Sequence, residues 1–417
     1  MRVLWFTNTP CNYTQVGYNG GGWMSALQTE IQKQKDVELG ICFCMENQPK
    51  KTEHEGTTYY PVPQHRKAFK DKIIDLCRYK DLTRDEILWS HYITHFKHVI
   101  EDFRPDVIEV FGSELYMGLA AIAARDKNIP FALHIQGLLS LYIYIYFPPE
   151  VSQWQYIWKD YNLKHAFSRF QELVYWQRSC HREKTILKAC INVIGRTTWD
   201  MDALRGLNPE AIYHYGGEIL RSEFYEPIER QLPTIPIIST TSSMPLYKGF
   251  DIVLKIARIL KEEFHLQFVW NVYGEVDYTF AERITGIKHG DVNICLCGMV
   301  SAQQLHEVLC GTTLYVQPSY IENSPNSVCE AQISSVPVIA TNVGGTSSLV
   351  KHGETGLLFP ATDPYMGAYY VRELIEDLDK NRKMGKTARE EALSRHNRDK
   401  IITDLLNTYK TIIQNVQ

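Results

Sequence analysis

Two glutamates flank a run of seven residues that contains a proline and an asparagine. Glu322 comes first, Pro325 and Asn326 follow, and Glu330 closes the group. A short apolar run, 314–317, precedes Glu322 and predicts a buried strand, so this glutamate should lie on the loop at the strand's carboxyl end. Ligands of open α/β sheets bind at that edge. The spacing therefore predicts a ligand site, with two solvated glutamates near a helix start as the alternative.

The residues after Pro325 predict a helix that starts at the same edge. Proline suits the first turn because its missing N–H costs nothing there. The backbone N–H groups of Asn326 and Ser327 would lie at the positive end of this helix, where they can bind a phosphate. Glu330 falls about one turn further along, where it can accept hydrogen bonds from a ribose diol. The segment therefore favours binding of a phosphate and a ribose together.

Lys248 lies on the loop between a predicted strand, 235–240, and a predicted helix, 250–263. Gly249 follows it, and a lysine in this position can reach the same edge as Asn326. If a phosphate group leaves at this edge, negative charge develops on it, and a fixed cation stabilises that transition state. A surface lysine near a helix start is the alternative.

Glycines and a histidine mark the first half of the chain. Gly20, Gly21 and Gly22 follow an apolar strand, so that the backbone can approach a ligand closely and the next helix offers its N-terminus. A flexible loop is the alternative for such a run. His134 ends the predicted strand 131–134, and on this pattern alone it fits a core or loop histidine.

Short apolar runs alternate with helical patterns along the whole chain, which predicts parallel, doubly wound sheets. Such runs in the first half are 3–6, 37–43, 107–110, 131–134 and 191–194. Those of the second half are 235–240, 268–273, 292–296, 314–317 and 337–341. Long helical insertions are expected at 65–103 and 150–188.

A proline-rich segment, 222–236, separates the two alternations and predicts an interdomain linker. We therefore expect two Rossmann-like α/β domains that face a cleft, over residues 1–225 and 226–395. The last helix, within 396–417, is expected to pack back on the first domain.

The second half of the chain resembles a known family, the retaining glycosyltransferases of family 4, whose two-domain fold is named GT-B. The resemblance rests first on the pattern E-x-x-P-N-x-x-x-E-A, which runs from Glu322 to Ala331. It covers most of residues 235–360 and extends only weakly into the first domain. The other similar stretches are Lys248–Asp251, Tyr273–Gly274, Cys297–Val300, Pro337–Thr341, Gly344–Gly345 and Gly353–Leu358.

The resemblance implies transfer of a sugar from a UDP- or GDP-sugar to a hydroxyl group of a saccharide or lipid-linked saccharide. It implies a reaction without a metal or other cofactor, retention of the anomeric configuration, and a setting in polysaccharide or glycoconjugate assembly. Glu322 would orient the donor sugar, and Lys248 would stabilise the leaving phosphate. The implied donor contacts are Gly21 and Gly22 in the glycine loop, Gly298 and Val300 near the base, Asn326 and Ser327 at the diphosphate, and Glu330 at the ribose.

Two positions depart from the family's pattern. The family has an arginine five residues before the lysine, where this chain has Ser243, and Arg196 is a candidate to supply that second cation. The family also places a histidine beside the reacting sugar. Alignment gives Gln136 and Gly137 there, and His134 lies two residues before Gln136, so the resemblance makes His134 a candidate catalytic residue.

Three other patterns resemble sites. The D-x-D segment 200–202 has the form of a metal site, but it falls at a predicted helix start, where we expect it to be solvated and capping. His91, His95 and His98 share a predicted helix face, yet no glutamate follows His91 as a metalloprotease requires, so metal binding is not favoured. The segment 141–147 alternates tyrosine with isoleucine, which suits a half-buried strand or an acceptor-side wall.

The composition restricts the class of protein. A net charge of −4 over 417 residues disfavours a nucleic-acid binder. Scattered cysteines, an N-terminus too quickly polar for a signal peptide and the lack of a membrane-length apolar run predict a cytoplasmic protein. The segment 65–84 carries seven Lys or Arg and three Asp, which predicts weak contact with the inner face of an anionic membrane; a solvated helix face is the alternative.

Other functions stay open on the sequence alone. The same fold also serves sugar-nucleotide epimerases and phosphorylases, although no cofactor lysine of a phosphorylase is evident. A non-catalytic, two-lobed sugar-binding protein would be expected to carry an export signal. An NAD-dependent dehydrogenase is disfavoured because no G-x-G-x-x-G follows any strand.

Overall fold

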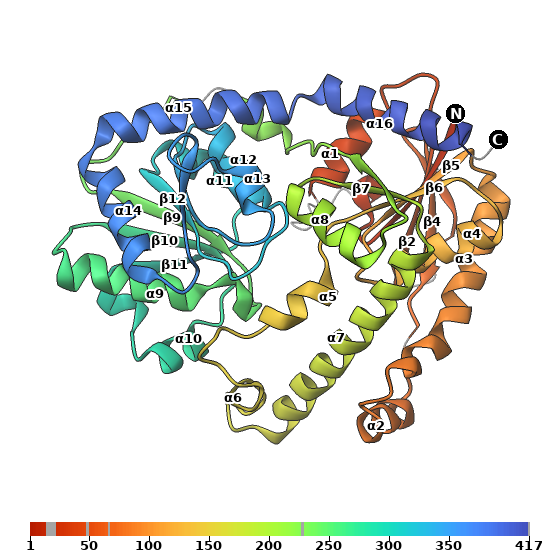
Figure 1. Ribbon diagram of the computed structural model, residues 1–417, viewed down its shortest axis with the longest axis horizontal. Helices are drawn as coiled ribbons and strands as arrows, with labels where there is room; N and C mark the ends of the chain where they lie inside the picture. The colour runs from red at the N-terminus through yellow and green to blue at the C-terminus, as the bar shows by residue number, and fades with distance from the viewer. Residues whose placement is uncertain (14–21, 47–49, 66, 227–228, 416–417) are drawn as a thin grey trace. The chain divides into compact units, whose positions relative to one another are not determined.

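The computed structural model describes residues 1–13, 22–46, 50–65, 67–226 and 229–415. They form two α/β units (Figure 1). Unit 1 comprises Met1–Ile143, Asp160–Ile219 and Arg398–Gln417, and unit 2 comprises Tyr144–Lys159 and Leu220–Asn397. The predicted fold class, two doubly wound α/β domains, is confirmed. The segment Tyr144–Lys159 groups with unit 2, whereas the sequence placed it in the first domain.

Unit 1 is built on an eight-stranded sheet with the order β3-β4-β2-β1-β5-β6-β7-β8. Neighbouring strands are parallel except for β3 and β4, which are antiparallel. From β1 the chain proceeds toward one side of the sheet, and from β5 toward the other, so the topological switch point lies between β1 and β5. The strands are β1 (Arg2–Thr7), β2 (Glu38–Met45), β3 (Thr52–His54), β4 (Thr57–Pro63), β5 (Val107–Phe111), β6 (Phe131–His134), β7 (Asn192–Gly195) and β8 (Ile212–Tyr215).

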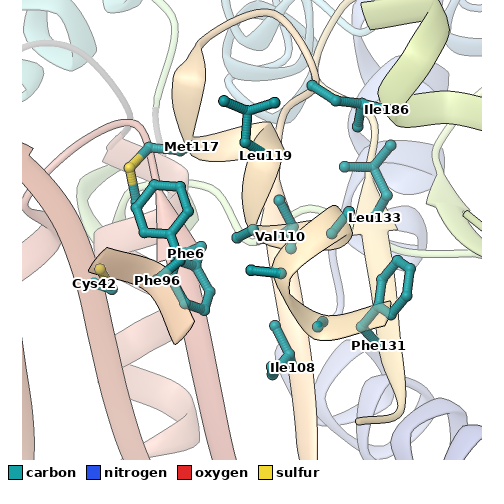
Figure 2. Close-up of a cluster of buried hydrophobic side chains, with 14 of the residues drawn as sticks. Phe6, Cys42, Phe96, Ile108, Val110, Met117, Leu119, Phe131, Leu133 and Ile186 are labelled. Carbon is teal, nitrogen blue, oxygen red and sulfur yellow. The ribbon is translucent and has the colours of Figure 1, made fainter. Parts of the chain in front are cut away.

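Helices cover both faces of this sheet, as the buried faces of a parallel sheet require. They are η1 (Cys11–Tyr13), α1 (Gly22–Ile31), α2 (Phe69–Cys77), η2 (Leu82–Leu88), α3 (Trp89–Phe103), η3 (Tyr116–Leu119), α4 (Ala120–Asp126), α5 (Leu139–Tyr142), α7 (Leu163–Ala189), α8 (Thr198–Leu207) and α16 (Arg398–Gln414). Figure 2 shows one core, where Phe6 of β1 meets Phe96 of α3. On the opposite face Trp5 packs with α1 and α16. The last helix therefore belongs to unit 1.

Unit 2 is built on a six-stranded parallel sheet with the order β11-β10-β9-β12-β13-β14. Its switch point lies between β9 and β12, because the chain proceeds from these two strands toward opposite sides. The strands are β9 (Ile237–Ser242), β10 (Val269–Gly274), β11 (Ile294–Gly298), β12 (Leu314–Gln317), β13 (Val338–Thr341) and β14 (Gly356–Phe359).

Helices of unit 2 pack on both faces of its sheet around two buried cores. Trp270 and Ile252 lie in one core, and Tyr315 and Val328 lie in the other. The helices are α6 (Gln153–Ile157), η5 (Ser222–Tyr225), η6 (Leu246–Lys248), α9 (Phe250–Arg258), η7 (Ile259–Glu263), α10 (Tyr278–Thr285), η8 (His289–Val292), α11 (Ala302–Cys310), α12 (Asn326–Ile333), α13 (Thr346–Leu349), α14 (Pro364–Glu376) and α15 (Leu378–Arg395).

One predicted strand is absent from the described structure. The tyrosine–isoleucine segment 141–147 forms the end of α5 and the short turn η4 (Ile143–Ile145). Tyr144 is 80% exposed, whereas Tyr142 and Tyr146 are buried. The alternation therefore does not follow one strand face, and the prediction of a half-buried strand is wrong. No helix within the described ranges is both long and apolar enough to span a membrane.

Candidate functional site

Lys248 and Glu322 lie on neighbouring loops at the switch point of unit 2. The first loop follows β9 and the second follows β12, and these strands are adjacent and parallel. The ammonium nitrogen Nζ of Lys248 lies 2.7 Å from Oε1 of Glu322. The lysine side chain is 25% exposed and the glutamate side chain 8%. Two residues that the sequence singled out separately thus form one ion pair, and solvent reaches its lysine.

Close backbone contact joins the two loops. Gly249 has a positive φ of 75°, and a Cβ built there would lie 2.0 Å from the carbonyl oxygen of Pro318. Any other residue at this position would push the loops apart. The amide of Tyr320 donates to the carbonyl oxygen of Tyr247 at 2.7 Å, which fixes the two loops in register.

Hydrogen bonds from the β12 side hold Glu322. Ser319 Oγ donates to its Oε1 at 2.7 Å, and Gln317 Nε2 donates to the same oxygen at 3.3 Å. The amide of Gly345 donates to the backbone carbonyl of Glu322 at 3.0 Å. Ser327 Oγ in turn donates to Oε1 of Gln317 at 3.0 Å, which ties the start of α12 to this network. The carboxylate is therefore held in one orientation.

The surroundings of Lys248 keep its side chain charged. Burial alone would lower the pKa of Lys248, but the Glu322 carboxylate outweighs that effect, so the pKa lies above its ordinary value of 10.5. A cation in a partly buried loop attracts an anion more strongly than one in bulk water does. Lys248 can therefore act as a fixed positive charge for a phosphate group.

The start of α12 lies at the same network, at the predicted residue Asn326. The helix begins at Asn326, so Asn326 and Ser327 occupy its first turn, and Pro325 is the N-cap residue. No acidic side chain lies in this first turn. The backbone amides of both residues are thus at the positive end of a helix, where an anion is stabilised.

Glu330 lies about one turn into α12 and is paired with an arginine that the sequence did not single out. Arg221 donates to Oε1 of Glu330 from Nε at 2.9 Å and from a terminal nitrogen at 2.8 Å. Glu330 is only 4% exposed, and the guanidinium also lies 5.0 Å from the ring centroid of Phe224. The arginine therefore fixes the orientation of this carboxylate.

Three further predicted donor residues, Gly298, Val300 and Gly22, lie at the end of a strand, on the loop that follows it and at the start of a helix. Gly298 ends β11 with a positive φ of 70°, and apart from its chain neighbours no described atom lies within 4 Å of a Cβ built there. Val300 is half-buried and packs against a core of unit 2. Gly22 is the first residue of α1 in unit 1, and Gly21 lies outside the described residues.

His134 ends β6, but it is buried inside unit 1 with 2% exposure. Its Nδ1 lies 2.8 Å from Oε1 of Glu109, and the other oxygen of Glu109 accepts from the hydroxyl of Tyr409. The ring stacks on Phe111 at 5.3 Å and lies against Trp23. Nε2 is buried without a hydrogen-bond partner in the part of the chain that the structure describes. The catalytic role of His134 stays a prediction.

A second pair of polar side chains lies at the switch point of unit 1. Asn8 follows β1 and Glu114 follows β5, and Asn8 Nδ2 donates to Oε1 of Glu114 at 2.5 Å. Burial raises the pKa of Glu114 to about 7, and the charge of Glu183 adds to this effect. Such a pKa suits a group that exchanges protons at neutral pH.

Arg196, the candidate for a second cation, is held inside unit 1. Its terminal nitrogen lies 2.9 Å from Oε2 of Glu218, and its guanidinium lies 5.0 Å from the ring centroid of Trp23. Its use in place of an arginine at Ser243 stays a prediction.

The D-x-D segment caps a helix, as predicted, but Asp200 is buried rather than solvated. Asp200 accepts from the backbone amides of Arg196 and Thr197. The hydroxyl of Tyr213 also donates to it at 2.7 Å. These donors replace water, which is why the carboxylate can be buried. Among the described residues no group of three or more His, Cys, Asp or Glu could hold a metal ion.

Sequence reasoning missed Arg221 and Glu114. Glu114 carries the same signal as Glu322, namely a polar residue after a buried strand of a parallel sheet. Arg221 carries no comparable signal, because it stands just before the predicted linker and 109 positions from Glu330. Only the folded chain brings these two together.

Residues 226–391 match the family of glycosyl transferases group 1. A D-inositol 3-phosphate glycosyltransferase of Paenarthrobacter aurescens is 28% identical over 34% of this chain and 36% of its own length. A GDP-mannose-dependent alpha-mannosyltransferase of Corynebacterium glutamicum is 22% identical over 64% of this chain and 58% of its own length. The chain thus matches about a third of the first relative and somewhat over half of the second.

Solved structures show the same fold over the full chain. Sucrose-phosphate synthase of Thermosynechococcus elongatus has a TM-score of 0.73 at 17% identity and covers 99% of both chains. Anabaena HepE, in complex with UDP and glucose, has a TM-score of 0.65 at 13% identity and covers 99% of this chain and 100% of its own. The family match thus lies within unit 2, over residues 226–391, whereas the similarity of fold extends over 99% of the chain.

Proposed function

We propose that this protein transfers a sugar from a nucleoside diphosphate sugar to a hydroxyl group of an acceptor. The observation that carries the proposal is the ion pair of Lys248 and Glu322 at the switch point of unit 2, beside the start of α12. The match of residues 226–391 to the glycosyl transferases of group 1 supports it. The printed names of relatives also favour a sugar nucleotide, since one is described as GDP-mannose-dependent and one structure holds UDP and glucose.

In this proposal unit 2 binds the donor. Lys248 and the first-turn amides of α12, from Asn326 and Ser327, bind the diphosphate. Glu330, oriented by Arg221, accepts hydrogen bonds from the ribose. Gly298 and Val300 lie beside the base. Glu322 orients the donor sugar by hydrogen bonds to its hydroxyl groups.

The reaction breaks the bond between the sugar's anomeric carbon and the β-phosphate oxygen, and the acceptor oxygen forms a bond to the same carbon. Lys248 stabilises the charge that develops on the departing phosphate. The β-phosphate oxygen takes the acceptor's proton, so that the acceptor attacks on the face that the diphosphate leaves. This route retains the anomeric configuration and uses fixed protein charges in place of a metal ion; His134 assists but is not required.

Stereochemistry tests this route separately from donor binding. Proton NMR of fresh product from an α-linked donor should show an α-linked product. A β-linked product would contradict retention and the role given to Glu322.

The acceptor is a saccharide or a lipid-linked saccharide, and unit 1 carries the acceptor-side residues. The setting is assembly of polysaccharide or glycoconjugate in the cytoplasm, with weak contact to an anionic membrane through 65–84. The apolar side chains Phe69 and Ile73 of this segment are 75% and 43% exposed, which favours a lipid contact.

A thermal-shift screen against UDP, GDP and their sugar conjugates tests donor binding. A ligand that binds only the native state raises the melting temperature, so one of the two nucleotide series should do so. Lys248→Ala should lose most of that shift. Lys255→Ala is the matched control, because Lys255 on α9 forms ion pairs with Glu150 at 2.9 Å and Asp251 at 3.5 Å, whereas Lys248 pairs with Glu322. The absence of any shift with both series at millimolar concentration would contradict the proposal.

A further inference from the structure

A cavity of about 400 Å³ lies in unit 1, at the carboxyl ends of its strands. Asn8 after β1, Cys44 near the end of β2, Gln64 after β4 and Leu115 after β5 all line it. Helices α2 and α7 supply the rest of the wall. Ligand sites typically measure about 300–1,000 Å³ and occur outside the carboxyl ends of strands at a switch point. The position and volume therefore fit a small-molecule site.

Much of the cavity wall is apolar or aromatic. The apolar and aromatic residues of the wall include Leu76, Leu88, Tyr92, Tyr116, Met117 and Val174. A bare saccharide would leave many hydroxyl groups without hydrogen-bond partners against such a wall, at a cost in free energy. The lining therefore favours an occupant that carries an apolar chain.

Three cationic side chains and one carboxylate line the same cavity. Lys67 and Arg178 lie 2.7 Å and 3.0 Å from the carboxylate of Asp75. Lys72 forms no ion pair with any residue that the structure describes. Arg178 is 2% exposed, and its Nε is buried without a hydrogen-bond partner among the described residues. Positive charge is in excess, which favours an anionic group on the occupant.

The apolar surface continues outside the cavity on α2. Lys72 and Leu76 of this helix line the cavity, whereas Phe69 and Ile73 of the same helix are exposed, and none of its residues is buried. In Figure 1, α2 lies at the lower edge of the picture, far from the labelled strands of unit 1. A chain that leaves the cavity along α2 therefore meets further apolar side chains.

We propose that this cavity binds the acceptor as a lipid-linked phosphate, with the phosphate at Lys72 and Arg178 and the apolar chain along Leu76 and Val174. The reacting hydroxyl then lies at the wall that Asn8 forms. That the occupant is the acceptor rests on the proposed function; its chemistry, an apolar chain with a phosphate, rests on the cavity alone.

Isothermal titration calorimetry of the full-length protein with farnesyl phosphate, farnesol and inorganic phosphate tests this inference. Farnesyl phosphate should bind, farnesol should bind at least tenfold more weakly, and phosphate alone should give no measurable heat. Lys72→Glu should lower the affinity for farnesyl phosphate at least tenfold. Lys70→Glu is the matched control, because Lys70 is exposed on the same helix but does not line the cavity, and it should leave the affinity unchanged.

Three results would overturn the inference. Equal binding of farnesol and farnesyl phosphate would remove the phosphate site. Equal weakening by Lys72→Glu and Lys70→Glu would indicate attraction to the helix surface instead. Unchanged affinity in Leu76→Trp, which fills the cavity, would place the ligand elsewhere; circular dichroism and the melting temperature establish that this variant is folded.

The test separates this inference from the proposed function. Lys248→Ala should bind farnesyl phosphate as the wild type does, because Lys248 belongs to unit 2. If sugar nucleotides neither bind nor react but farnesyl phosphate binds with this pattern, the proposed function fails and the cavity's ligand chemistry stands. If sugar nucleotides react and farnesyl phosphate does not bind, only the inference about the acceptor fails.

Discussion

The two sheets each have a switch point, and the polar side chains at these points differ in charge. In unit 2 a lysine, Lys248, faces the carboxylate of Glu322. In unit 1 an amide, Asn8, faces the carboxyl group of Glu114, whose pKa is raised to about 7. The same strand arrangement therefore presents a fixed cation in one unit and a protonatable acid in the other.

This difference matches the two halves of the proposed reaction. A leaving diphosphate gains negative charge, so the group beside it should be a cation that stays charged. An attacking hydroxyl is neutral and gives its proton to the β-phosphate oxygen in the proposed route, so the group beside it needs no fixed charge and can be a hydrogen-bonding acid such as Glu114. We infer that the fold alone does not decide whether a sheet serves the leaving diphosphate or the attacking hydroxyl. The side chains that follow β1, β5, β9 and β12 decide it.

Replacing the cation should give the largest effect. Lys248→Ala should lower kcat by about 100-fold or more, about 3 kcal/mol of transition-state stabilisation, while the protein stays folded. Initial rates of nucleoside diphosphate release measure it, and Lys255→Ala on the following helix should react like the wild type. Wild-type turnover in folded Lys248→Ala would break the comparison, because the two switch points would then not differ in function.

Replacing the acid should change the pH dependence of stability. Folded Glu114 keeps its proton up to about pH 7, whereas the unfolded chain loses it near the ordinary value of 4.5. Between these values the folded state binds more protons, so the contribution of Glu114 is fully present below pH 4.5 and is lost as the pH rises through 7. Relative to Glu114→Gln, the wild type should therefore lose up to about 3 kcal/mol of unfolding free energy across this window.

Urea denaturation of both proteins from pH 4.5 to 8 measures this difference. Stability curves that stay parallel over the whole range would show that Glu114 ionises normally. The raised pKa of the acid at the switch point of unit 1 would then be contradicted.

Replacing Tyr409, which hydrogen-bonds to the Glu109 carboxylate that pairs with His134, should alter stability more than catalysis. The hydroxyl of Tyr409 donates to Glu109 and accepts from Trp5 Nε1 at 3.1 Å, all inside unit 1. Tyr409→Phe should cost about 1–2 kcal/mol of unfolding free energy, because a buried carboxylate oxygen loses its donor, with kcat changed less than about threefold. Tyr365→Phe, at an exposed tyrosine, is the control. A tenfold loss of kcat in folded Tyr409→Phe would instead bring His134 into the chemistry.

Chelation should have no effect. If fixed charges at the switch point of unit 2 neutralise the diphosphate, activity in excess EDTA should equal activity without it. Complete loss that magnesium restores would show that a metal ion, rather than Lys248 and α12, does this work.

Much of the fold follows from local sequence, because each buried strand of a parallel sheet is a short apolar run and the ten predicted runs all correspond to strands. β3, β4, β8 and β14 lie at or next to the sheet margins, and their patterns were not recognised. The sequence could predict that Lys248 and Glu322 lie near each other, because both residues follow buried strands. The partner of Glu330 and the pKa of Glu114 were not, since both depend on contacts between distant segments.

A crystal structure with the nucleoside diphosphate that raises the melting temperature tests the central claim most directly. The account predicts the β-phosphate within hydrogen-bond distance of Lys248 Nζ and of the first amides of α12. It also predicts the ribose at Glu330. A diphosphate bound in unit 1, or bound in unit 2 without contact to Lys248, would contradict it.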